Sequence, residues 1–174
     1  IIAVPCGDNP VALERINQNV PVVLVDRFYS NSDLPYVTTN NYKGSVEACD
    51  ILLSRGYKKI VCIQGELSSG PNRERVKGYY DTMKLAGLED VTSVVGNEFS
   101  IQNGYLETKL LLNKKESIDA IFALSNTIVL GAMKAIREVG LRIPEDIAIV
   151  SFDDNMYMEY LTPCLLYTSP SPRD

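Results

Sequence analysis

The sequence lacks histidine and tryptophan, and it has fewer basic than acidic residues. Histidine is the commonest general base and metal ligand, so its absence excludes Ser-His-Asp hydrolases, HExxH zincins and His-Cys zinc sites. The 17 Lys and Arg residues against 22 Asp and Glu residues give a net charge of −5. Because binding to phosphates needs a cationic face, this segment is not expected to grip nucleic acid by itself.

Long apolar runs and paired cysteines are missing as well. No run reaches the roughly 18 apolar residues of a membrane helix. The start, Ile1–Pro5, has no initiator Met and no basic signal-peptide region, and it resembles the interior of a strand. We therefore expect the chain to begin inside a longer protein. The four cysteines show no C-x-x-C spacing, which argues against a disulfide framework, and Cys49 and Cys62 are expected to be small core residues.

The last eleven residues, Cys164–Asp174, follow neither a helical nor a strand period. They contain two of the nine prolines, and all eleven codons fit the translation of a transposase-type sequencing adaptor. We expect the natural sequence recorded here to end at Pro163 and residues 164–174 to be an artefact. A Ser/Pro-rich linker is the alternative.

Short apolar runs alternate with amphipathic stretches through the rest of the chain. The pattern predicts strands at residues 1–4, 21–26, 59–65, 92–95, 118–123 and 147–152. It predicts helices at residues 11–18, 41–55, 73–86, 102–112 and 126–139, with Leu13, Ile16, Leu106, Leu110 and Leu111 among their inward-facing side chains. This order is typical of an α/β fold with parallel sheets flanked by helices on both faces.

Polar residues follow four of the predicted strands. They are Asp26–Arg27, the segment Gly65–Ser69, the segment Leu124–Asn126 and the segment Phe152–Asn155. Each could be a solvated loop or a helix cap, but ligands bind at the carboxyl ends of parallel strands, so their convergence favours a polar pocket. Arg73 and Arg75 begin a predicted helix, where they are either surface charges or the source of a bidentate grip on a polar ligand.

Motifs for cofactors and catalysis are missing. Neither G-x-G-x-x-G nor a P-loop GK[ST] occurs, and Ser68 and Ser69 have no histidine to activate them. The pair Asp153–Asp154 could hold a cation, but Glu159 is the one further acidic ligand nearby. We expect no cofactor, no metal and no enzymatic activity.

Several segments, in this order, resemble lac/gal-type repressors. Residues 140–154, GLRIPEDIAIVSFDD, are very close to the family pattern G-x-x-[IV]-P-x-D-[IV]-[AS]-[VI]-[VI]-G-[FY]-D-D. Residues 21–27, PVVLVDR, look like a central strand of the family. Residues 56–60, GYKKI, followed by Gly65 and by Arg73-x-Arg75-x-x-Gly78-Tyr79, resemble another of its segments. Residues 124–126, LSN, with residues 130–135, LGAMKA, resemble a further strand end and helix.

The resemblance implies a two-lobed, periplasmic-binding-protein-like (type I) effector domain. Residues 1–39 would form part of lobe 1, and residues 40–163 a nearly complete lobe 2. The protein would be a cytoplasmic, homodimeric transcriptional regulator without membrane association. It would bind a small-molecule effector, most simply a sugar, through this segment, and operator DNA through a helix-turn-helix domain upstream that the segment lacks.

The resemblance also implies effector contacts, namely Asp26, Ser69, Arg75, Phe99, Ser125, Asn126 and Asp153. Arg75 would grip hydroxyls or carboxylates, Phe99 would stack on a ring, and Asp153 would accept two hydroxyls. Tyr57 stands where the family has His, Leu124-Ser125-Asn126 replaces Ala-Asn-Asp, and Ser151 replaces Gly. The changes at Ser125 and Asn126 leave the effector's identity open.

Two other classes remain as alternatives to a regulator. A periplasmic sugar-binding protein of a transporter would share the fold and the pocket, but it would follow a signal peptide instead of a helix-turn-helix. An enzyme on a Rossmann-like sheet would need a nucleophile–base pair or a cofactor loop, and neither motif is found.

Overall fold

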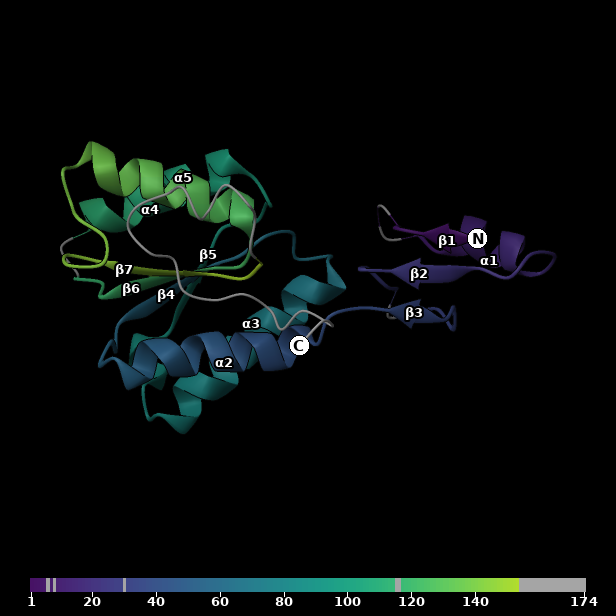
Figure 1. Ribbon diagram of the computed structural model, residues 1–174, viewed down its shortest axis with the longest axis horizontal. Helices are drawn as coiled ribbons and strands as arrows, with labels where there is room; N and C mark the ends of the chain where they lie inside the picture. Colours follow the sequence, from purple (N-terminus) through teal and green to yellow (C-terminus); the bar gives the residue numbers. More distant parts are fainter. Residues whose placement is uncertain (6, 8, 30, 115–116, 154–174) are drawn as a thin grey trace.

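The computed structural model describes residues 1–153, apart from residues 6, 8, 30, 115 and 116. The described elements form two parallel sheets, which lie apart along the long axis (Figure 1). The α/β class with parallel sheets flanked by helices is thus confirmed. The expectation for residues 164–174 falls outside the described residues. None of the described helices is long and apolar enough to cross a membrane.

The first sheet has the strand order β1-β2-β3 and is small. Its strands are β1 (Ile2–Ala3), β2 (Val23–Val25) and β3 (Tyr36–Val37), and it is accompanied by α1 (Val11–Asn17). Its core consists of Val22, Leu24, Tyr29 and Leu34. The chain then passes through residues 38–40 to the second sheet's helices (Figure 1).

The second sheet has the strand order β5-β4-β6-β7 and carries helices on both faces. Its strands are β4 (Ile60–Ile63), β5 (Ser93–Val95), β6 (Ala120–Ala123) and β7 (Ala148–Ser151). Helices α2 (Asn41–Ser54) and α3 (Gly70–Leu85) cover one face, and α4 (Ile101–Asn113) and α5 (Asn126–Glu138) cover the other (Figure 1). A 3-10 turn, η1 (Glu89–Val91), precedes β5.

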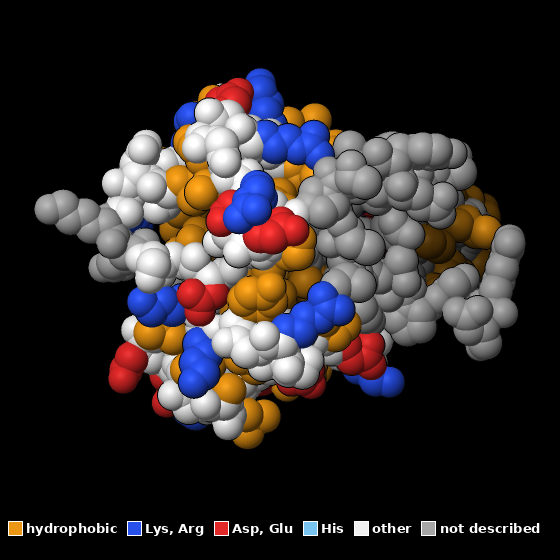
Figure 2. All heavy atoms as spheres, turned by 60° about the vertical axis from the view of Figure 1, so that its left-hand side comes forward, with side chains coloured by type: hydrophobic (Ala, Val, Ile, Leu, Met, Phe, Trp, Pro, Cys, Tyr) orange, Lys and Arg blue, Asp and Glu red, His pale blue; other side chains and the backbone are white. Residues whose placement is uncertain are grey.

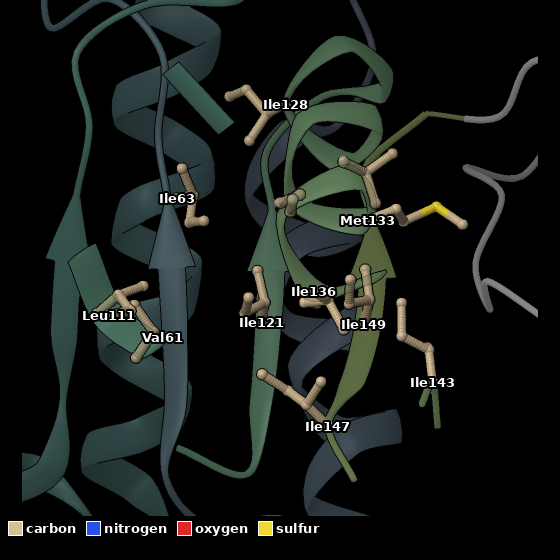
Figure 3. Packing of buried hydrophobic residues seen from close by; sticks show 13 residues of the cluster. Val61, Ile63, Leu111, Ile121, Ile128, Met133, Ile136, Ile143, Ile147 and Ile149 are labelled. Carbon is tan, nitrogen blue, oxygen red and sulfur yellow. The ribbon is translucent and has the colours of Figure 1, made fainter. Parts of the chain in front are cut away.

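Alternate side chains of the buried strands fill two cores. Val61, Ile63, Ile121 and Ile149 pack with Ile128, Met133 and Ile136 of α5, as Figure 3 shows. Cys62, Phe122 and Val150 face the opposite way, toward α2 and α3. Cys49 and Cys62 are free and fully buried in this second core, which confirms them as core residues. The two cores hold the carboxyl ends of the strands in a fixed arrangement.

Several local expectations were wrong. Helix α3 begins at Gly70 rather than at residue 73, because Ser69 caps it by accepting a hydrogen bond from the Asn72 N–H and Pro71 fits the first turn. Strand β3 and the turn η1 were not predicted, because they are too short to show a hydrophobic period in the sequence. Leu106 and Leu110 are 47% and 58% exposed, since α4 packs through Asn103, Gly104, Thr108 and Leu111 instead. Ile16 is exposed as well, because α1 buries no residue completely.

Candidate effector-binding site

The seven residues predicted to bind an effector line one cavity of about 260 Å³. The cavity lies between the elements of the two sheets, with Asp26 following β2 and the remaining six residues coming from the second sheet's loops and helices. The strands are parallel, so their carboxyl ends meet on the same side. The structure therefore brings all seven together, and their contact with a ligand stays a prediction.

The two aspartates of the cavity share an unusual backbone conformation. Asp26 has φ +69° and Asp153 has φ +70°, and within the described part of the chain they are the non-glycine residues with positive φ. The left-handed region costs an L-residue about 1–2 kcal/mol. Such outliers cluster at functional sites, where the surrounding fold holds a side chain in a required direction.

Arg75 is the most constrained side chain of the cavity, with its side chain 7% exposed. Its Nε donates to Asn41 Oδ1 over 2.8 Å, and its Nη1 donates to the Leu124 carbonyl over 2.7 Å. The guanidinium lies 3.7 Å from the centroid of the Phe152 ring. Two of the three guanidinium nitrogens, Nε and Nη1, thus donate hydrogen bonds within the protein. Nη2 makes no hydrogen bond to the described residues.

Arg75 and Asp153 form an ion pair that does not offset their burial. The distance from Nη1 to Asp153 Oδ2 is 3.4 Å, at the long end for a hydrogen bond. Burial lowers the pKa of Arg75 despite the nearby acids. Burial likewise raises the pKa of Asp153, with Arg75 opposing the rise and Asp26 adding to it. In both residues, burial therefore outweighs the attraction between the two charges.

Phe99, which lines the cavity, packs closely against Gly65. A Cβ at Gly65 would lie 2.4 Å from three atoms of the Phe99 ring, so a glycine is required there. Asn103 holds the loop that carries Phe99, because its Nδ2 donates to the carbonyls of Gln64 and Glu98. The aromatic ring is thus fixed where it can cover one face of a ligand.

Two serines of the cavity also begin helices. Ser69 accepts from the Asn72 N–H at the start of α3, and Ser125 accepts from the Ile128 N–H at the start of α5. The Ser125 hydroxyl further shares a hydrogen bond with Thr127 Oγ1 over 3.0 Å. Capping therefore fixes both hydroxyl groups in position.

A chain of hydrogen bonds joins Arg75 to Asp26 through the crossover segment. Asn41 accepts from Arg75 and donates through Nδ2 to Thr38 Oγ1 at 3.4 Å and to the Thr39 carbonyl at 3.0 Å. Thr38 Oγ1 in turn donates to the Asp26 carbonyl over 2.9 Å. The two sides of the cavity are therefore linked through the segment that connects the sheets.

Some residues that shape the cavity were not predicted from the sequence, because they contact it from distant parts of the chain. Asn41 and the Leu124 carbonyl both accept a hydrogen bond from Arg75, although they lie 34 and 49 residues from it in the sequence. No local sequence pattern predicts either contact. Arg27, Pro71 and Thr127 also line the cavity. Arg27 could have been predicted as a lining residue, because it directly follows the end of a predicted strand.

Metal binding finds no support within the described residues, where no group of three or more Cys, Asp and Glu side chains is placed to hold an ion. Asp154 and Glu159, the two acids considered with Asp153, lie outside the described residues. Figure 2 shows basic, acidic and apolar side chains interspersed on the face of the second sheet's helices and loops that is in view.

The sequence of the chain is similar to a known domain family and to known repressors. Residues 49–173 match the sequence profile of the periplasmic binding protein-like domain. The Haemophilus influenzae ribose operon repressor is 30% identical over 162 residues, which are 92% of this chain and 49% of that protein. The chain spans about half the length of the curated relatives it matches.

Solved structures agree with the sequence comparison. A regulatory protein of the LacI family from Chloroflexus aggregans superposes with a TM-score of 0.82 at 29% identity, covering 94% of this chain and 60% of that one. The lac repressor dimer bound to operator and an anti-inducer also superposes with a TM-score of 0.82, at 25% identity, covering 94% of this chain and 50% of that one.

Proposed function

The chain belongs to the periplasmic binding protein-like domain family, and on this premise we propose that it is the effector-binding core of a LacI-type transcriptional regulator. The effector is a sugar or a related polyhydroxyl compound. The observation that carries the proposal is the cavity in which Asp26, Arg75 and Asp153 converge with Phe99.

The chemistry of the cavity suits a sugar. Two carboxylates accept hydroxyl protons, and the free Nη2 of Arg75 donates to a hydroxyl oxygen, each as a charge-assisted hydrogen bond. Phe99 covers the apolar face of a ring. The two aspartates of the cavity, Asp26 and Asp153, balance the charges of its two arginines, Arg27 and Arg75. A lining without net charge favours a neutral ligand over a strongly charged one.

Such a ligand would act by drawing the two sheets together. It contacts Asp26 on one side and Arg75 and Asp153 on the other, so it binds best when both sides are close. In the complete protein, which we propose to be a homodimer, closure changes the geometry of the dimer and hence the affinity for operator DNA.

The test is calorimetric titration of the purified protein with a panel of pentoses, hexoses and disaccharides. We expect a bound sugar, and we expect Arg75→Ala and Asp153→Ala each to lower its affinity at least 100-fold, because each change removes a charge-assisted contact and leaves the partner charge unpaired.

The matched controls are Arg142→Ala and Asp146→Ala, an exposed Arg–Asp pair outside the cavity. Both should leave the affinity within twofold of the parent. Circular dichroism checks that all four variants fold. Unchanged binding in both cavity variants would contradict the site assignment.

The alternative, a periplasmic sugar-binding protein of a transporter, shares the pocket, but the relatives and structures named above are repressors and regulators. The coding sequence upstream separates the two. A basic helix-turn-helix domain supports the regulator, and a signal peptide with its cleavage site contradicts it.

A further inference from the structure

A second cavity adjoins the effector-binding cavity. It has a volume of about 310 Å³, and Arg27, Ser69 and Pro71 line both cavities. Phe28, Glu66, Ser68 and Arg73 line the second cavity alone. Ligand pockets usually measure roughly 300–1,000 Å³, so each cavity alone lies near the lower end of that range. A ligand that fills both must be longer than one ring.

The second cavity contains polar side chains without partners. Within the described part of the chain, the Arg27 guanidinium, the Glu66 carboxylate and the Ser68 hydroxyl make no hydrogen bond or ion pair. Arg73 differs, because its Nη1 donates back to the carbonyls of Leu67 and Ser68. The free donors and acceptors can therefore bind a polar ligand without breaking existing contacts.

An aromatic wall completes the second cavity. The Phe28 ring stacks on Tyr36 with the centroids 4.5 Å apart and the planes 15° apart. The far edge of the same ring meets α3, where a Cβ at Gly70 would lie 3.1 Å from it. Phe28 thus spans from the first sheet to the helices of the second, and its position depends on the absence of a side chain at Gly70.

We infer that the effector is a compound of two linked sugar units. This inference rests on the proposed function. One ring lies between Asp26, Arg75 and Phe99, and the second lies between Phe28, Glu66 and Ser68. Arg27 faces both units at their junction. Because Arg27 and Arg73 line this cavity together with Glu66, a phosphate group is the anionic competitor of the neutral second unit, and the experiment includes it.

The experiment compares disaccharides with the monosaccharides that compose them. Cellobiose, maltose, lactose and sucrose are titrated calorimetrically into the purified protein, alongside glucose, galactose, fructose and glucose 6-phosphate. We expect one disaccharide to bind at least tenfold more tightly than its component sugars, because the second unit gains its own hydrogen bonds.

Two variants locate the second unit. Glu66→Gln changes an exposed side chain without partners in the described part of the chain, so it leaves the fold intact, and Phe28→Ala removes the aromatic wall. Each should lower the disaccharide affinity about tenfold and leave monosaccharide affinity within twofold. Glu145→Gln, an exposed change elsewhere, is the matched control for the first variant.

The remaining outcomes overturn one claim or the other. A monosaccharide that binds as tightly as any disaccharide, or variants that weaken both ligands equally, would overturn the two-unit inference and leave the proposed function standing. If glucose 6-phosphate bound most tightly, the second cavity would be a site for an anionic group, and the inference of a neutral second sugar unit would be wrong. Failure to bind any sugar would overturn the proposed function itself.

Discussion

At the scale of single residues, Asp153 of the candidate site combines a raised pKa with an unusual backbone conformation. Its side chain is 44% exposed, yet burial and the nearby Asp26 raise its pKa more than Arg75 lowers it. Its backbone has φ +70°, a conformation that asparagine tolerates well. We therefore propose that the charged carboxylate serves a contact with a ligand rather than the stability of the empty protein.

Replacing Asp153 by Asn should raise the melting temperature of the ligand-free protein at pH 7, by at most about 2 °C. The amide keeps the shape and removes the charge that burial and Asp26 disfavour. The same variant should lose effector binding. Thermal denaturation followed by circular dichroism measures the first effect, and a lower melting temperature at pH 7 would show that the Arg75 contact dominates.

The advantage of Asp153→Asn depends on pH. Because the pKa of Asp153 is raised on folding, the folded chain binds this proton more tightly than the unfolded chain does. The destabilisation by Asp153 is present above its folded pKa and disappears as the pH falls through that value toward the unfolded one. The melting temperatures of parent and variant should therefore converge on acidification, and a gap that widens would contradict the assigned direction.

At the scale of elements, the crossover between β3 and α2 connects the two sides of the site. Thr38 Oγ1 holds the carbonyl of the strained Asp26 and accepts from Asn41, which in turn holds Arg75. Thr38 does not line the cavity. An effect of Thr38 on a ligand would therefore be indirect, through Asp26, whose carbonyl it holds, and through Asn41, which holds Arg75.

Replacing Thr38 by Val should weaken effector binding about fivefold, because it removes the hydrogen bond to the Asp26 carbonyl, worth about 1 kcal/mol, and frees Asp26 from its strained conformation. The longer hydrogen bond from Asn41 is lost as well, while Asn41 keeps its bond to the Thr39 carbonyl. The neighbouring Thr39→Val is an isosteric control, since the Thr39 hydroxyl makes no hydrogen bond within the described residues. Calorimetry on both variants measures the difference. Equal losses in the two would show that the crossover does not position Asp26.

The elements with a strong period were predictable from sequence, and the rest depended on tertiary contacts. The strands β4, β6 and β7 are buried on both faces, so each appears as a continuous apolar run. The two-residue strand β3 is exposed and depends on its pairing with β2, which no local pattern encodes. The same division holds in the site. Asp26 and Asp153 follow predictable strands, whereas Asn41 finds Arg75 only in the folded chain.

At the scale of the whole molecule, the candidate site belongs to neither sheet alone. The second sheet has two well-packed cores, while the first sheet is narrow and leaves Ile2, Val4 and Val37 more than half exposed. Within the described residues, one connection, residues 38–40, joins them. A ligand that contacts both Asp26 and Asp153 would add a further link, and we propose that it acts on the arrangement of the two sheets.

A crystal structure of the protein with its tightest-binding sugar would test the proposed effector site most directly. We expect the sugar to lie between Asp26 and Asp153, to accept a hydrogen bond from Arg75 Nη2 and to have a ring face against Phe99. A sugar found instead at another cavity, such as the one of about 400 Å³ beside Lys59, Ser93 and Lys114, would contradict it.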